Sequence, residues 1–249
     1  MGGISIAVIV GLCSYRFLCM RYMYKLRGNT RFDSLSQYLR KGVTVFAPTN
    51  CLLYMATKAK ARGAILDTSH YEDLKKIKAN WTMIRDEAMK LYQDGIFDQT
   101  VDPDSAAYYD VGFRTFYKYG WSKFYLSWYG YVHNSARRLC PRTSELLSSL
   151  KSINGAMFSI LPPGSKLTPH CDPIASSLRY HLGLMTPNND QCYINVDGHI
   201  YSWRDGKDFL FDETYIHFVN NHTDNYRLIL MCDVNRPTSW LGSLDQLAF

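Results

Sequence analysis

Two histidines and one aspartate in this chain have the residue types and the spacing of a metal site. His170 and Asp172 are separated by one residue. On an extended backbone, both side chains therefore point to the same side and can reach one ion. His217 lies in a second polar segment and can supply a third ligand. Two imidazoles and a carboxylate on one face of an octahedral ion are the ligands of non-haem Fe(II) oxygenases, and they leave positions for a co-substrate and O2.

Other interpretations of these residues exist. An isolated His-x-Asp pair is more often a turn histidine beside a turn or capping aspartate, here followed by Pro173. His222, in the polar loop Asn-Asn-His-Thr-Asp, is a rival third ligand. The downstream sequence favours the metal site over the turn, because it adds an anion-binding residue.

That residue is Arg227, which begins an apolar segment that continues as Leu-Ile-Leu-Met. A buried arginine needs an anionic partner, since an unpaired buried charge is costly. The planar guanidinium can bind a carboxylate through two hydrogen bonds, and the distal carboxylate of 2-oxoglutarate would satisfy it. Arg179 and His181 alternate on one face of another predicted strand and form a second plausible anion-binding pair.

The elements that would position these residues are predicted to be strands. From Ile153 onward, short apolar runs are separated by Pro, Gly, Asn and Asp turns, which is typical of a jelly roll. Residues 191–203 read as a hairpin closed by Asp197-Gly198. Upstream, apolar residues three or four apart predict one helix over 71–94, and a short helix is expected over 143–150. Half of the residues in 108–131 are aromatic, and they could line an acyl groove or pack on the sheet.

The N-terminal segment favours a membrane surface over nucleic acid. Gly2–Met20 is mostly apolar and just long enough to cross a bilayer of roughly 30 Å, although it could also be a buried or interfacial helix. The chain has a net charge of +6, and residues 1–41 hold seven basic residues and one acidic residue, so the remainder is neutral. Excess positive charge beside an apolar segment fits anionic lipid headgroups and places the body in the cytoplasm. A second apolar run over 43–56, interrupted by Pro48, is too short to span and should lie in the interface or on the domain.

The seven cysteines have no regular spacing, which indicates a reducing compartment and argues against disulfides or a cysteine zinc site. No nucleic-acid motif and no obligate protein partner is indicated.

Residues 155–237 resemble the aspartyl/asparaginyl β-hydroxylase family of Fe(II)/2-oxoglutarate dioxygenases, and within it the bacterial branch that hydroxylates lipid A. The phrases that carry this resemblance are Leu-Pro-Pro-Gly-Ser-Lys-Leu (161–167), His-Cys-Asp-Pro (170–173), Ser-Leu-Arg-Tyr-His-Leu-Gly-Leu (177–184), Cys-Tyr-Ile-Asn-Val-Asp-Gly (192–198), Tyr-Ser-Trp-Arg-Asp-Gly (201–206), Phe-Asp-Glu-Thr-Tyr-Ile-His (211–217) and Cys-Asp-Val (232–234). The similarity extends upstream, through Tyr-Asp-Val-Gly-Phe (109–113) and Cys-Pro-Arg-Thr (140–143), to the N-terminal apolar segment, and so covers nearly the whole chain.

The resemblance implies roles for individual residues. His170 and His217 match the iron ligands. Asp172 matches an aspartate of the lipid branch, where the animal peptide hydroxylases have glycine, so a carboxylate ligand is available. The positions that hold 2-oxoglutarate match Ser159, Arg179, His181 and Arg227. Cys171 departs from the arginine expected in the lipid branch, and its side chain should point away from the metal.

The resemblance further implies a double-stranded β-helix core with flanking helices. We expect a membrane anchor and basic segment at 1–41, a helical and aromatic region at 42–152 and the dioxygenase core at 153–249. The implied activity is 2-hydroxylation of a secondary acyl chain of lipid A at the bacterial inner membrane, with Fe(II), 2-oxoglutarate and O2. The alternatives are hydroxylation of an ornithine-type lipid, hydroxylation of peptidyl Asp or Asn, and a metal-free jelly-roll binding protein.

Overall fold

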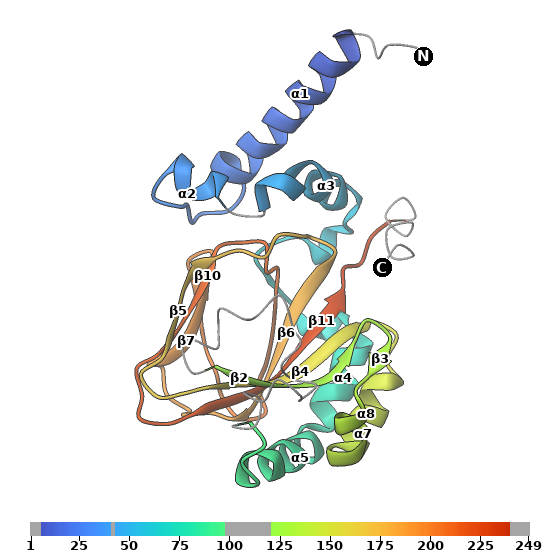
Figure 1. Cartoon of the computed structure of the whole chain (residues 1–249), viewed down its shortest axis with the longest axis vertical. Helices are drawn as coiled ribbons and strands as arrows, with labels where there is room; N and C mark the ends of the chain where they lie inside the picture. Colours follow the sequence, from blue (N-terminus) through green and yellow to red (C-terminus); the bar gives the residue numbers. More distant parts are fainter. Residues whose placement is uncertain (1–5, 41–42, 98–120, 240–249) are drawn as a thin grey trace.

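The core of the protein consists of two antiparallel β-sheets that face each other (Figure 1). The computed structural model describes residues 6–40, 43–97 and 121–239. The seven-stranded sheet comprises, in spatial order, β1 (Ile65–Leu66), β9 (Asp208–Phe211), β6 (Ser177–Met185), β11 (Arg227–Asn235), β4 (Ile153–Leu161), β2 (Ser122–Trp128) and β3 (Tyr131–Val132). The four-stranded sheet comprises β5 (Lys166–His170), β10 (His217–Asn221), β7 (Cys192–Val196) and β8 (His199–Ser202).

From β4 to β11 the chain passes repeatedly between the two sheets. Strands β4, β6, β9 and β11 lie in the large sheet, and β5, β7, β8 and β10 lie in the small one. Two four-stranded layers connected in this way form a jelly roll, so the expected core architecture is present. The large sheet also takes in β1, β2 and β3, which precede residue 153.

The two sheets differ in their burial. Strands β4, β6 and β11 are buried almost without interruption, because the large sheet is covered on both faces. The small sheet alternates buried and half-buried positions along β7 and β10, as expected when one face meets water. The predicted hairpin is confirmed: β7 and β8 are joined by Asp197 and Gly198, both with positive φ as a two-residue turn requires.

Helices cover the outer face of the large sheet (Figure 1). These are α4 (Glu72–Ala79), α5 (Trp81–Gln93), α7 (Asn134–Leu139) and α8 (Pro141–Ser148). Leu74, Ile77, Ile84 and Leu91 recur at helical spacing and join one apolar core with the sheet. The single helix predicted over 71–94 is wrong in one respect: the chain breaks at Asn80, whose ψ of 14° lies outside the helical region.

The N-terminal helices form a separate layer over one end of the barrel (Figure 1). This N-terminal layer contains α1 (Ile6–Arg21), the π-helical turn η1 (Tyr22–Leu26), α2 (Leu35–Leu39) and α3 (Val43–Ala56), which continues through Pro48. Short 3-10 turns at Ala59–Ala61 and Thr68–His70 lead from this layer to α4.

The expected transmembrane helix is not supported within these ranges. Helix α1 has 16 residues, fewer than the apolar run from which a span was expected. Across residues 6–40, 43–97 and 121–239, no helix combines the length and apolar character needed to cross a bilayer. Most of the aromatic stretch 108–131 lies outside the described residues.

Candidate metal centre and co-substrate site

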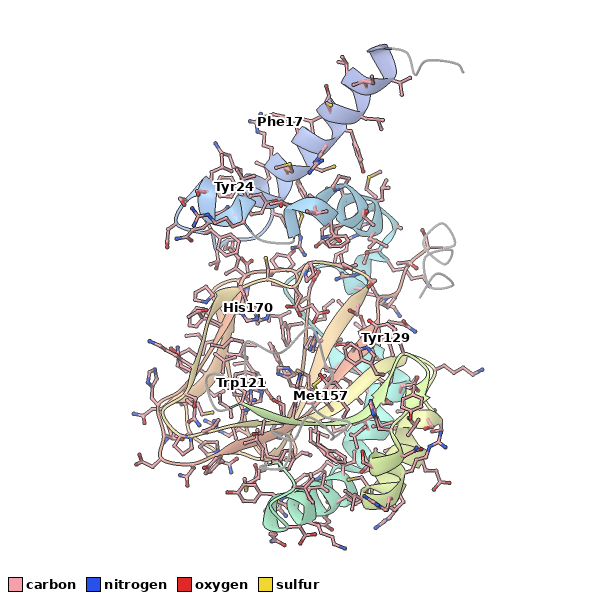
Figure 2. The ribbon with its side chains drawn as sticks, in the orientation of Figure 1. Phe17, Tyr24, Trp121, Tyr129, Met157 and His170 are labelled. Carbon is pink, nitrogen blue, oxygen red and sulfur yellow. The ribbon has the colours of Figure 1, made fainter. Side chains whose placement is uncertain are left out.

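The two histidines of the predicted metal site lie directly opposite each other on neighbouring strands. His170 ends β5 and His217 begins β10, and the antiparallel pairing matches them as cross-strand partners. Their ring centroids are 4.1 Å apart. The chain therefore brings together two imidazoles that are far apart in sequence, at the end of the barrel that faces the N-terminal layer (Figure 2).

Local hydrogen bonds orient both rings. Nδ1 of His170 lies 2.8 Å from the carbonyl oxygen of Thr168, and Nδ1 of His217 lies 2.9 Å from that of Tyr215. A carbonyl only accepts, so each Nδ1 carries the hydrogen and each Nε2 keeps its lone pair for an ion. Burial, with a further contribution from His170, lowers the pKa of His217 well below its usual value. His217 is therefore neutral at physiological pH, which is the form that binds metals.

Asp172 completes a three-residue cluster. One ligand atom from each of His170, Asp172 and His217 lies within 4.8 Å of the others. The Asp172 side chain is 31% exposed, so the cluster is open to solvent on the aspartate side. Two imidazole nitrogens and one carboxylate oxygen suit Fe(II) and similar divalent cations, so the donor set fits the expected ion. His222 is not part of this group; it follows the opposite end of β10.

Arg179 lies in a different setting from the one expected. Its guanidinium forms ion pairs with Asp172 (3.1 Å), with Asp233 (3.1 Å) and, at still closer range, with Glu213. Burial lowers the pKa of Arg179, but Asp233, Glu213 and Asp172 more than offset this, and the net shift is upward. Three carboxylates thus already engage Nε and Nη2 of Arg179, and one of them belongs to Asp172 of the candidate cluster. The expected role of Arg179 in binding 2-oxoglutarate stays a prediction.

The carboxylates around Arg179 make the metal end of the barrel anionic. With all groups ionised, three carboxylates outweigh one guanidinium by two negative charges, and with Glu213 protonated the excess is one negative charge. Burial raises the pKa of Glu213 to about 8; Arg179 opposes this shift and Asp172 adds to it.

A buried cation that has no carboxylate partner in the described part of the chain lies deeper between the sheets. Arg227 is 1% exposed, and its Nη2 is 3.4 Å from Oγ of Ser159. Among the described residues its Nε has no hydrogen-bond partner. The guanidinium lies over the rings of Trp203 (4.4 Å) and Trp121 (5.3 Å). Burial lowers the pKa of Arg227 to about 10, so the group remains charged at neutral pH.

His181 adds unused hydrogen-bonding capacity to the same region. Within the described part of the chain, both of its buried ring nitrogens lack a partner. Burial, followed by the positive charge of Arg227, lowers its pKa well below the usual value, so the ring is neutral. Its ring contacts Phe211, which also contacts His217. Ser159, His181 and Arg227 thus offer a hydroxyl, an imidazole and a guanidinium to an anion, and this donor set fits the distal carboxylate of 2-oxoglutarate.

Comparison with known proteins agrees with this geometry. The sequence profile described as aspartyl/asparaginyl beta-hydroxylase matches residues 78–237. The chain belongs to this family. The region that the profile matches contains all seven residues of the candidate metal and co-substrate sites.

Relatives within the hydroxylase family differ in their substrates. The ornithine lipid ester-linked acyl 2-hydroxylase of Rhizobium tropici is 37% identical over 118 residues, which are 47% of this chain and 42% of that protein. The aspartyl/asparaginyl beta-hydroxylase of Homo sapiens is 30% identical over 178 residues, which are 69% of this chain and 22% of that protein. The chain thus spans less than half the length of both relatives.

Solved structures resemble the chain only distantly. An oxidoreductase of the 2OG-Fe(II) oxygenase family from Burkholderia pseudomallei has a TM-score of 0.33 and 11% identity, covering 48% of this chain and 69% of that one. A predicted oxalate decarboxylase from Thermotoga maritima has a TM-score of 0.31 and 11% identity, covering 46% and 80%. At these scores the likeness supports no functional conclusion.

Two residues of the candidate site were missed by the sequence analysis. Glu213 and Asp233 both lie in phrases that resemble the family, but neither was given a role. The signal that could have identified them is the need of a buried Arg179 for carboxylate partners. Cys171 packs against the buried cluster of Phe32 and Tyr38 in the N-terminal layer.

Proposed function

We propose that this protein is an Fe(II)/2-oxoglutarate-dependent dioxygenase that hydroxylates carbon 2 of a secondary acyl chain of lipid A. The observation that carries the proposal is the pair of complementary sites between the two sheets. One is a cluster of two imidazoles and a carboxylate, and the other is a buried guanidinium that has no carboxylate partner among the described residues. A divalent cation and a dicarboxylate satisfy both sites.

Each residue of the two candidate sites has a distinct task in this proposal. His170, Asp172 and His217 hold the ion, and Arg179 keeps the Asp172 carboxylate turned toward it. Arg227 and Ser159 hold the distal carboxylate of 2-oxoglutarate, and neutral His181 can donate a further hydrogen bond. Trp203 and Phe211 surround these polar groups with apolar surface and keep water from the co-substrate.

When bound, the iron supplies the oxidation chemistry, in which 2-oxoglutarate and O2 become succinate, CO2 and the hydroxyl group of the product. The protein needs no general base for this reaction. Its contribution is to fix the metal, the co-substrate and the substrate relative to one another.

The N-terminal layer supports an acyl-lipid substrate and a membrane partner. Its exposed apolar side chains include Leu12, Phe17 and Leu18 of α1 and Leu52 and Met55 of α3. Basic side chains at Arg16, Arg21, Lys25 and Arg40 are also exposed on this layer. Apolar surface bordered by positive charge is complementary to an anionic bilayer. We propose that the protein acts at the cytoplasmic face of a bacterial inner membrane.

Ornithine lipid is the second candidate substrate. The relative from Rhizobium tropici is named as a 2-hydroxylase of the ester-linked acyl chain of that lipid. This similarity supports carbon 2 of an acyl chain as the reacting carbon, and the name of this relative favours the ornithine headgroup. Peptidyl aspartate is a weaker candidate, because a peptide substrate gives the exposed apolar layer no role.

The test is the lipid composition of a bacterium that makes lipid A and ornithine lipid but lacks acyl hydroxylation. Wild type, His170→Ala and the control His222→Ala are expressed to equal levels, and both lipids are analysed by mass spectrometry. We expect lipid A heavier by one oxygen with wild type and His222→Ala, and unchanged lipid A with His170→Ala. Fragmentation should place the oxygen on carbon 2 of a secondary chain.

Other results reassign the function. Modified ornithine lipid with unchanged lipid A would replace the first candidate by the second. No modified lipid, together with His170-dependent iron binding and succinate release on a peptide, would favour the peptide hydroxylase. A wild-type protein that binds no iron would be a jelly-roll binding protein and would refute the enzyme proposal.

A further inference from the structure

The N-terminal layer contacts both chain segments that carry metal ligands. The first segment, residues 170–175, contains His170 and Asp172, and the second, residues 212–217, ends at His217. Neither contact with the ligand segments was predicted from the sequence, which indicated a membrane surface or packing on the domain for this part of the chain. Figure 2 shows His170 at the end of the barrel below the layer that contains Tyr24.

Asn50 of α3 binds the first segment. Its Nδ2 donates to the carbonyl of Pro173 (2.8 Å), and its Oδ1 accepts from the backbone N–H of Ala175 (2.8 Å). Asn50 is 0% exposed, so removing its amide would leave a buried carbonyl and a buried N–H without their protein partner. One buried amide thus fixes the backbone that directly follows Asp172.

Arg27 binds the second segment. Its Nη1 donates to the carbonyl of Thr214 (3.0 Å), and its Nη2 pairs with Oδ2 of Asp212 (2.8 Å). The guanidinium lies between the rings of Tyr54 (4.1 Å) and Tyr215 (3.6 Å). Although Arg27 belongs to the basic N-terminal sequence, only 6% of its side chain is exposed, so it serves the loop before His217 and not the lipid surface.

Further bonds connect these contacts into one network. The hydroxyl groups of Tyr54 and Thr214 are 2.5 Å apart, and Arg236 forms a second ion pair with Asp212 at 2.9 Å. The two ligand segments are also bonded to each other, because the N–H of Asp172 donates to the carbonyl of Glu213 (2.8 Å). A shift of the N-terminal layer would therefore move both segments and change the spacing of the three ligands.

We infer that Asn50 and Arg27 are positioning residues through which the N-terminal layer sets the geometry of the metal centre. This inference rests on the proposed function, since it requires that His170, Asp172 and His217 bind a metal. Groups that orient ligands without touching the ion typically change metal affinity 10- to 100-fold when they are removed. The layer that faces the membrane in the proposed function is thus also the support of the active site.

Affinity for Co(II) tests the inference without the reaction. The full-length protein in detergent is freed of metal, titrated with Co(II) and followed by the visible absorption of the bound ion, which reports its ligand geometry. The variants are Asn50→Ala, Arg27→Lys and His170→Ala. Asn50→Ser replaces Asn50→Ala if the alanine variant does not fold, and thermal unfolding is measured for every protein.

Asn221→Ala is the matched control. Asn221 is also 0% exposed, and its Nδ2 bonds the carbonyls of Pro162 (3.0 Å) and Asn225 (2.8 Å). It ends β10, the strand that His217 begins, so its bonds hold loops at the opposite end. Its removal should lower stability to a similar degree and leave the metal ligands in place.

We expect Asn50→Ala and Arg27→Lys to bind Co(II) about 10-fold more weakly or worse, with altered absorption bands, and Asn221→Ala to bind as wild type does. Unchanged affinity in both layer variants would overturn the inference while leaving the metal site intact. Equal weakening in Asn221→Ala would overturn it too, because general destabilisation would then explain the loss. If wild type binds no Co(II), or binds it equally well without His170, the proposed function itself fails.

Discussion

At the scale of single residues, two buried arginines show how this protein separates function from stability. Arg236 is 1% exposed and satisfied: it pairs with Asp212 and donates to the carbonyls of Ala175 and Ser177. Arg227 is equally buried, yet it lacks a carboxylate among the described residues. A paired buried charge supports the fold, whereas an unpaired one weakens the fold until its ligand binds.

Replacing each arginine by methionine should therefore have opposite effects on the free energy of unfolding. Arg227→Met removes an uncompensated charge and should raise the free energy of unfolding by about 2 kcal/mol. The same variant should raise the KM for 2-oxoglutarate on the order of 100-fold. Arg236→Met removes one of the two cationic partners of Asp212 and should lower the free energy of unfolding by about 3 kcal/mol. Urea denaturation measures the free energy of unfolding, and steady-state succinate release measures the KM. A less stable Arg227→Met protein with unchanged KM would contradict the proposed carboxylate site.

The sequence identified those candidate site residues whose proposed role follows from the chemistry of their own side chain and not from the partners that the fold brings to them. His170 and His217 can be identified because few residue types bind Fe(II), and Arg227 because a charge in an apolar strand needs a ligand. The role of Arg179 could not be predicted in this way. Its partners Glu213 and Asp233 lie in two other segments, and only the folded sheets bring these carboxylates to one guanidinium.

At the scale of elements, β6 is fixed on the large sheet by a close backbone crossing. The N–H of Gly183 donates to the carbonyl of Lys207 (3.0 Å), and its carbonyl accepts from Gly206 (2.9 Å). A Cβ on Gly183 would overlap the carbonyl oxygen of Arg204, so the loop can approach only a glycine. Strand β6 also carries Arg179, beside the candidate metal cluster, and His181, in the candidate co-substrate site. This crossing therefore holds a strand that contributes to both sites.

Gly183→Ala should accordingly destabilise the protein by about 3 kcal/mol, because a backbone atom and not a flexible side chain obstructs the new methyl group. Gly11→Ala is the control: no atom lies within 4 Å of that Cβ position in α1, and alanine favours a helix. Chemical denaturation should show the loss for Gly183→Ala alone. Equal stability of the two variants would mean that the loop after β8 moves freely.

Helices and turns could be predicted where the sequence signal lies within the element itself. The hairpin around Asp197-Gly198 follows from its turn residues, and the apolar spacing of α4 and α5 follows from one buried face. The break at Asn80 and the passage of α3 through Pro48 were not predictable. Each depends on packing against the barrel, which overrides the local preference of the chain.

At the scale of the whole molecule, exposed apolar surface is concentrated in the N-terminal layer. Leu52 and Met55 of α3 are 56% and 75% exposed, while Asn50 and Leu53 of the same helix are buried against the domain. Helix α3 therefore has one face for the barrel and one for an external apolar phase. This agrees with the expectation that residues 43–56 lie in an interface or on the domain.

Charging the outer face of α3 should abolish membrane binding. The double variant Leu52→Glu, Met55→Glu should lower partitioning onto vesicles of anionic phospholipid at least 10-fold, since it removes apolar area and repels the headgroups. Wild-type binding should fall with added salt. Ile200→Glu, at a 66% exposed residue on β8, is the control and should bind normally. If cosedimentation is equal for all three proteins, this layer is not the membrane surface.

The position of β11 between β6 and β4 has a consequence for synthesis on the ribosome. The strand that completes the large sheet is the last one made, and it brings Arg227 and Asp233. Until it emerges, β4 and β6 expose unpaired edges next to each other, and Arg179 lacks one of its carboxylates. The helices of the N-terminal layer precede all of these strands in the sequence. In the proposed function, the nascent chain could therefore reach the bilayer before β11 is inserted and before the site that would hold iron is complete.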